Sequence, residues 1–193
     1  MVPAITVWRG FLAGDKQLAR HAVYPMPDKV LSSADGVLKA LEDIARKMGG
    51  GEVSVGFMAG ATYPDGTPVA AVAFWNEFGT SRVPPRPFFR TMIAKESPQW
   101  AKTMARMAKN SNYDGLRVLA LMGEDIGGAL VDSIRDVTSP PLAKSTILAR
   151  AKNVKRGDPV APTIAKPLID TAHMLKSVSY QVNEGTVVPI IKE

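Results

Sequence analysis

Residues 178–190 read VSYQVNEGTVVPI, and this stretch decides the fold class. From Val178 to Val182 apolar and polar residues alternate, which is the period of a strand with one buried face. Asn183-Glu-Gly185 then predicts a turn, and the apolar residues from Val187 to Ile190 bring the chain back. Because strands joined by such a turn run antiparallel, the stretch predicts a hairpin in an antiparallel sheet.

Upstream of the hairpin the apolar spacing is mostly helical. Val53–Phe57 alternates like a further strand, and the longest helical pattern covers residues 116–137. Small residues on one stripe of that helix (Ala120, Gly123 and Gly127) predict the close approach of another helix. Further helices are expected from a cap at Ser32 or Ser33 to a stop at Gly49–Gly51, from Ser97-Pro98, over 145–153 and up to Leu175. The apolar residues 69–78 fit a short buried helix or a strand, and the helix is preferred. Residues 88–95 fit a brief helix or an extended stretch equally.

The predicted architecture is α+β: a small antiparallel sheet with a C-terminal hairpin, packed against several amphipathic helices. Residues 32–193 are expected to form one domain. Residues 1–31 are expected to form an extended N-terminal arm with at most a short strand at Ile5–Trp8, because prolines and glycines punctuate them. The arm's aromatic residues need a surface to cover, and that surface belongs either to the chain's own core or to a neighbouring subunit.

Composition excludes several classes of function. The 193 residues include no cysteine and two histidines, which removes disulfides, thiolate nucleophiles, zinc knuckles and iron–sulfur ligation, as well as any three-histidine site within one chain. The net charge of +6 is mild for a DNA-coating protein. The sequence signals no cofactor and no small-molecule substrate, and no stretch approaches the length of a membrane span.

The candidate catalytic positions are His173 and the adjacent pair Glu124 and Asp125. His173 lies near Asp170, which could orient it as a general base in a hydrolase. No nucleophile-elbow sequence supplies an activated serine, and a lone histidine on a short capped helix is usually structural. Glu124 and Asp125 are adjacent on a helix, so their side chains diverge and do not form a paired-carboxylate site. We therefore expect a protein without enzymatic activity.

Basic residues gather in two clusters, at 86–109 and at 144–156. The second contains no acid, and its members are candidate DNA-facing residues because a duplex attracts cations regardless of sequence: Lys144, Arg150, Lys152, Lys155 and Arg156. Cationic faces of amphipathic helices, or salt bridges to acidic patches of partner subunits, are the more ordinary explanation of both clusters. A basic nucleic-acid-binding accessory protein is the alternative function that these residues support.

The most unusual segment is FWNEFGT at 74–80, followed by VPPRPFFR at 83–90. It combines aromatic residues, arginines and three prolines within seventeen residues. Phe, Trp and Arg are the residue types that anchor protein interfaces, and prolines stiffen the surface that presents them. The segment therefore predicts a preorganised contact surface.

This segment resembles the motif of tailed-bacteriophage neck or tail-completion proteins, a family described as putative tail components or virion-morphogenesis proteins. Further matches follow in order along the chain: the strand 53–57, Asp65-Gly-Thr67, PPLAKSTI at 140–147 and PLIDTAHMLKSV at 167–178. The resemblance covers roughly residues 33–188. The chain departs from the family pattern at Ala172, where glycine is usual, and this changes the cap geometry expected after Asp170-Thr171.

The resemblance implies a structural virion protein that forms part of the neck at the head–tail junction, completing the tail and joining it to the DNA-filled head. It would assemble in the host bacterial cytoplasm as a homo-oligomeric ring, sixfold by the symmetry usual in phage tails. Its neighbours would be the tail terminator, the tail tube and the head-completion or connector proteins, with non-specific proximity to DNA and no membrane. The expected interface residues are Trp75, Glu77, Phe78, Arg86, Phe88, Phe89 and Arg90. Glu77 is expected to pair with an arginine across or within the subunit, and Gly79 to set a tight turn.

Overall fold

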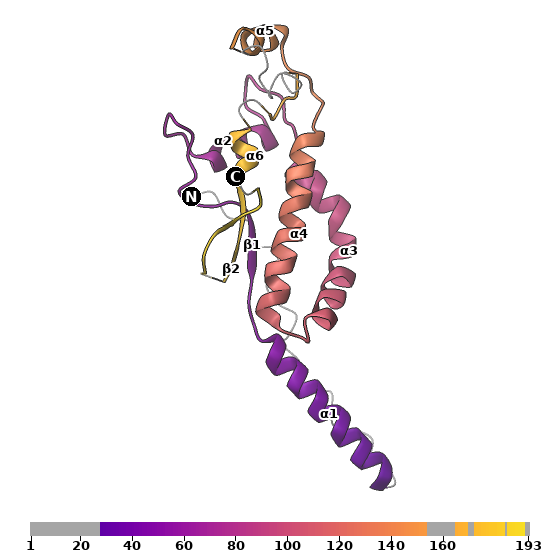
Figure 1. Ribbon diagram of the computed structural model, residues 1–193. Helices are drawn as coiled ribbons and strands as arrows, with labels where there is room; N and C mark the ends of the chain where they lie inside the picture. Colours follow the sequence, from indigo (N-terminus) through magenta and orange to yellow (C-terminus); the bar gives the residue numbers. More distant parts are fainter. Residues whose placement is uncertain (1–27, 154–164, 170–171, 184, 192–193) are drawn as a thin grey trace.

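The structure is a computed structural model, and it describes residues 28–153, 165–169, 172–183 and 185–191. These residues form an elongated molecule with helices at both ends and a small sheet beside a helical hairpin (Figure 1). The elements are α1 (Asp28–Met48), β1 (Val53–Phe57), α2 (Val69–Phe78), α3 (Phe89–Asn110), α4 (Gly115–Asp136), α5 (Lys144–Asn153), α6 (His173–Lys176), β2 (Val178–Val182) and β3 (Val188–Pro189).

The sheet has the strand order β1-β2-β3 and is antiparallel throughout. Val55 pairs with Tyr180 between β1 and β2, and Tyr180 pairs with Val188 between β2 and β3. The C-terminal hairpin and the α+β class are therefore confirmed. Strand β1 pairs with the hairpin although it lies more than a hundred residues earlier in the chain. This pairing brings together two segments that are separated in sequence by helices α2 to α6.

Helix α4 forms the centre of the core, between α3 and the sheet (Figure 1). Its buried face runs from Val118 to Ile134 and contains two glycines that contact the sheet. A Cβ atom at Gly123 would lie 2.4 Å from the Tyr180 ring, and one at Gly127 would lie 2.3 Å from Ile190 Cδ1. The sequence predicted that the small residues on this side of α4 pack against another helix, and this was wrong. They pack against the sheet, whose large side chains fill the space above the glycines.

Helix α3 is continuous from Phe89 to Asn110, with Pro98 inside it. The sequence predicted a helix start at Ser97-Pro98, and this was wrong. A proline inside a helix removes one hydrogen bond and costs about 3 kcal/mol. Pro98 is exposed, whereas residues on both sides of it, from Met92 to Ala108, pack against the core. Apolar contact on both sides of the proline keeps the helix in one piece.

Helix α1 ends at Met48 as predicted, with Gly49 at a φ of 55°. It begins at Asp28, earlier than the predicted cap at Ser32 or Ser33, so the expected boundary between arm and domain falls inside the helix. Its last turn contacts the start of α4, because a Cβ at Gly115 would overlap the Met48 carbonyl. The rest of α1 extends away from the body (Figure 1). The predicted strand at Ile5–Trp8 lies outside the described residues.

Helix α6 is preceded by Ala172, which has a φ of 59° and a ψ of 9°. This is the left-handed region, which glycine adopts without strain and alanine does not. The backbone at Ala172 thus has a geometry that suits glycine better than alanine. The proposed caps Asp170 and Thr171 lie outside the described residues.

Candidate functional site

The three motif segments at 73–90, 140–147 and 167–178 meet at one end of the molecule, around α2, α5 and α6 (Figure 1). Arg86 connects the first two segments: its Nε donates to the Pro140 carbonyl at 2.9 Å. Arg150 connects α5 to the third, donating to the carbonyls of Lys166 at 2.9 Å and Ile169 at 3.0 Å. Segments that lie far apart in the sequence therefore form one structural unit.

Glu77 joins the end of α2 to the start of α3. Its carboxylate accepts the backbone N–H groups of Phe88 and Phe89 at 2.9 Å and that of Arg90 at 3.2 Å. The first N–H groups of a helix have no partner within the helix, and the helix dipole favours a negative charge there. The Arg90 Nε also donates to the carboxylate at 2.8 Å. The expected pairing of Glu77 with an arginine is confirmed, and it lies within the subunit.

Gly79 sets the turn that follows α2, as predicted. Its φ is 78°, and a Cβ there would lie 2.9 Å from both the Pro85 nitrogen and the Val83 carbonyl oxygen. The Thr80 N–H donates to Val83 O at 2.8 Å, which closes the loop behind the glycine. The loop thus returns the chain to α2, where the Arg86 N–H donates to Asn76 O at 2.7 Å.

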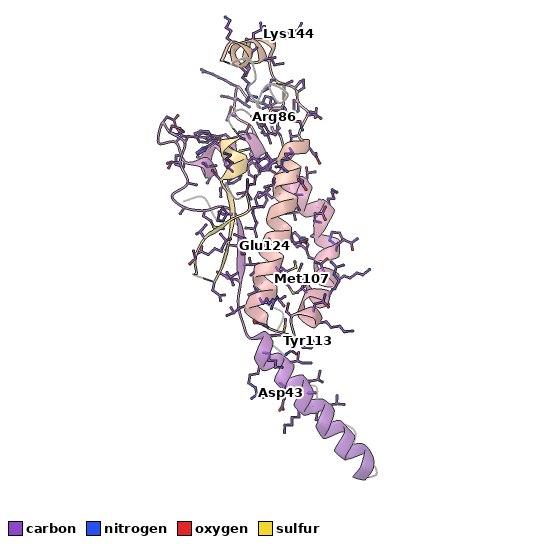
Figure 2. The ribbon with its side chains drawn as sticks, in the orientation of Figure 1. Asp43, Arg86, Met107, Tyr113, Glu124 and Lys144 are labelled. Carbon is purple, nitrogen blue, oxygen red and sulfur yellow. The ribbon has the colours of Figure 1, made fainter. Side chains whose placement is uncertain are left out.

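Three of the expected interface residues are buried inside the chain: Glu77, Arg86 and Phe88 are each 5 % exposed or less. Burial lowers the pKa of the Arg86 guanidinium, and the charge of Arg150 lowers it further. Arg86 is labelled in Figure 2 among the side chains between α2 and α5. Replacing Arg86 or Phe88 is therefore expected to destabilise the fold, because both side chains hold it together from inside.

The exposed part of the segment is an aromatic face, which we define as Phe74, Trp75, Phe78 and Arg90. The three aromatic side chains are 46–52 % exposed. The rings of Phe74 and Phe78 lie 4.7 Å apart, and the Arg90 guanidinium lies 4.8 Å from the centre of the Phe78 ring. Sequence reasoning missed Phe74, although its spacing of four from Phe78 on a helix could have placed it on the same face.

Phe89 is half-buried and packs against the core. Its ring lies 6.3 Å from that of Phe88, in an edge-on arrangement. The contact of all seven predicted interface residues with a partner stays a prediction, and the structure divides them into a supporting group and an exposed group.

A hollow of about 1,120 Å³ lies between α2, α5 and α6. The charged residues of its lining are mostly basic: Arg82, Arg86, Arg150 and Lys176 contribute to it, together with His173 and Asp65. His173 Nε2 lies 2.9 Å from the Thr62 carbonyl oxygen, which only accepts, so this nitrogen donates. The imidazole also lies 4.7 Å from the Tyr63 ring. These contacts support a role for His173 in holding α6 to the loop after β1, and its suggested partner Asp170 lies outside the described residues.

The candidate DNA-facing residues differ in whether they are exposed or bound to the chain's own backbone. Lys144 and Lys152 are exposed on α5, whereas Arg150 donates to main-chain carbonyls of the same chain. Figure 2 shows Lys144 at the tip of the molecule. Lys155 and Arg156 lie outside the described residues. Two exposed lysines can neutralise only a few phosphates of a DNA duplex.

Within the described ranges, no three acidic or histidine side chains gather closely enough to hold a metal ion. Among the helices that the structure describes, none has both the length and the apolar character to cross a membrane. No protein-family model, curated protein or solved structure matches this chain.

Proposed function

We propose that this chain is a structural virion protein of a tailed bacteriophage, located in the neck at the head–tail junction. It completes the tail and joins it to the DNA-filled head, as part of a homo-oligomeric ring with the sixfold symmetry usual in phage tails. The resemblance of the three motif segments to neck and tail-completion proteins suggests this function, and their convergence into one structural unit supports it.

The observation that carries the proposal is the aromatic face. Three large aromatic side chains are about half exposed on one side of α2, while the loop beside them is fixed by Glu77, Gly79 and Arg86. A surface that is rigid before binding loses little conformational entropy on association, and aromatic residues with arginine dominate the energetics of interfaces. This combination is typical of a surface that contacts another protein.

The polar groups of the motif support contact rather than catalysis. Glu77 accepts three backbone N–H groups, and Arg86 donates to the carbonyls of Pro140 and Pro141. A carboxylate and a guanidinium that hold the backbone in this way are not placed to transfer protons or bind substrate. The proposed partners are further copies of this chain, the tail terminator, the tail tube and the head-completion or connector proteins.

The decisive experiment uses a phage that carries this gene. Replacing Trp75 and Phe78 together by alanine removes most of the aromatic face without touching the core. We expect electron micrographs to show DNA-filled heads and free tails in place of joined particles. Val187→Ala is the matched control, because Val187 is 43 % exposed and lies outside the face. Joined particles at the wild-type frequency in the double variant would contradict the proposal.

The second candidate function is a basic nucleic-acid-binding accessory protein, and one observation favours it. Lys144 and Lys152 are both exposed and lie eight residues apart, which places them on one side of α5. If these two lysines contact phosphates, the logarithm of the DNA affinity falls against the logarithm of the salt concentration with a slope of about −2. The double variant Lys144→Gln/Lys152→Gln then loses this dependence. An unchanged slope in the variant would dismiss a role for these lysines.

A further inference from the structure

One face of α1 is apolar and uncovered. Val37, Leu38 and Leu41 are each more than half exposed, and they lie on a helix that extends away from the body of the molecule (Figures 1 and 2). The helix contacts the rest of the described chain chiefly at its last turn, near the start of α4. Large apolar side chains gathered on a projecting helix mark a surface that associates with another molecule.

The spacing of this face is that of a coiled coil. Val37, Leu41 and Ile44 follow one another in steps of four and three residues, and Met48 continues the spacing but packs against the core of its own chain. In the sequence the same steps continue upstream through Val30 and Ala34, so the pattern covers nearly the whole helix. A repeat of three and four is the seam along which helices pack side by side, with the residues of each layer interlocking.

We propose that α1 packs against the α1 helices of further copies of this chain, in a parallel bundle of more than two helices. The inference deepens the proposed function and rests on it in one respect: in a ring, copies are related by rotation, so helices that project from the same face run parallel. The bundle is a second contact between subunits, separate from the aromatic face.

Charge supports a second copy as the occupant. Helix α1 contains four acidic and four basic residues, so it is neutral, although the whole chain has a net charge of +6. Neutral helices associate with copies of themselves without net repulsion. An anionic membrane surface or a nucleic acid would instead select a helix with a basic polar face, which α1 does not have.

The residue types favour more than two helices. In the heptad repeat of the uncovered part of the helix, Leu41 occupies the a position, and the β-branched residues Val37 and Ile44 occupy d. Leucine at a with isoleucine at d shifts the preference of parallel coiled coils from dimers to trimers and tetramers. Leu38 and Ala45 at the neighbouring e position widen the apolar face, which a single partner helix would leave partly exposed.

Cysteine cross-linking tests the bundle on the full chain, which has no cysteine of its own. In a parallel bundle the d layer of one helix meets the d layers of its neighbours, within reach of a disulfide. We expect the purified Ile44→Cys variant to form a covalent dimer on mild oxidation. The matched control is Lys39→Cys, at position f on the opposite side of the helix, and it should remain uncross-linked. Equal cross-linking of both variants, or of neither, would overturn the proposal.

A second pair of variants measures the assembly without a covalent bond. Leu41→Glu/Ile44→Glu and Lys39→Gln/Arg46→Gln both lower the net charge by two, but only the first pair lies in the apolar face. Light scattering should give the mass of an oligomer for the wild type and for the second pair, and the mass of a monomer for the first. A monomeric wild type would overturn the bundle, including the case in which α1 is covered by another protein or by residues 1–27.

Each of the two proposals can be contradicted without contradicting the other. If Trp75→Ala/Phe78→Ala leaves head–tail joining intact while Ile44→Cys cross-links, the aromatic face is dismissed and the α1 bundle stands. If the aromatic variant separates heads from tails while the wild-type chain is monomeric in solution, the bundle is dismissed and the proposed function stands.

Discussion

The carboxylate of Glu77 accepts the backbone N–H of Phe88 at 2.9 Å, across the whole proline-rich loop. The acceptor is in the last turn of α2, and the donor is the residue that precedes α3. Through this contact one helix supplies the N-terminal cap of the next. The loop between them, which carries Arg86, is therefore fixed at both ends before any partner binds.

Replacing Glu77 should lower the free energy of unfolding. Glu77→Ala leaves several N–H groups at the start of α3 without their acceptor, and hydrogen bonds to a buried charge contribute about 1.5–3 kcal/mol each. We expect a loss of about 2–4 kcal/mol in urea unfolding, and a smaller loss for Glu77→Gln, which keeps one acceptor oxygen. Glu96→Gln, a change at the surface of α3, is the control and should stay within about 0.5 kcal/mol of the wild type.

Alanine substitutions at Phe88 and Phe78 should differ in their effect on the free energy of unfolding. Phe88 is 1 % exposed in the core, so Phe88→Ala should cost about 3–5 kcal/mol in the same measurement. Phe78 is half exposed, so Phe78→Ala should change stability by about 1 kcal/mol or less, the energy of its contact with Arg90 included. A core-sized loss for Phe78→Ala would show that the aromatic face is part of the fold and not a free surface.

Two glycines on α4 should respond oppositely to alanine. At Gly123 the added Cβ would lie 2.4 Å from the Tyr180 ring, which must move, and we expect a loss of about 1–3 kcal/mol. At Gly128 nothing lies within 4 Å of the added atom. Gly128→Ala should therefore raise stability by about 0.5–1 kcal/mol through helix propensity. Thermal unfolding of the pair checks both signs, and a gain at Gly123 would mean that the helix and sheet are not in close contact.

Ala172→Gly should stabilise the protein by about 0.5–1 kcal/mol. A left-handed backbone costs alanine about 1–2 kcal/mol, and part of the relief is lost because glycine makes the unfolded chain more flexible. Ala94→Gly, at an exposed position inside α3, should destabilise by a similar amount and serves as the control. Two losses of equal size in thermal unfolding would contradict the backbone geometry at Ala172.

Tyr180 should make the protein sensitive to alkaline pH. Burial raises the pKa of its phenol above the ordinary value of 10.0, and the Glu124 carboxylate, in hydrogen-bond reach of the hydroxyl, raises it further. Above pH 10 the unfolded chain therefore loses this proton before the folded chain does, so stability falls as the pH rises towards the folded-state pKa. Tyr180→Phe should reduce that fall in urea unfolding between pH 9 and 11, and an identical pH profile would contradict the assignment.

Local features of the site could be predicted from the sequence, and features that depend on distant contacts could not. The turn at Gly79 and the pairing of Glu77 with an arginine were anticipated, because both follow from residues close together in the chain. The burial of Arg86 was not, because its acceptors at Pro140 and Pro141 lie more than fifty residues further on. An exposed arginine is typical of an interface. When a second segment of the same chain covers it, the arginine instead donates hydrogen bonds that hold the fold together.

The sequence by itself determined the α+β class, the hairpin at 178–190 and the ends of most elements, because periodicity and turn residues act over a few positions. Only the tertiary structure decided that α3 continues through Pro98, that α4 presents its glycines to the sheet and that Glu77 caps α3. Each of these depends on contacts between residues remote in the chain, whose combined packing outweighs local preference. The aromatic face is defined in the same way: it consists of the part of the motif that those contacts leave exposed.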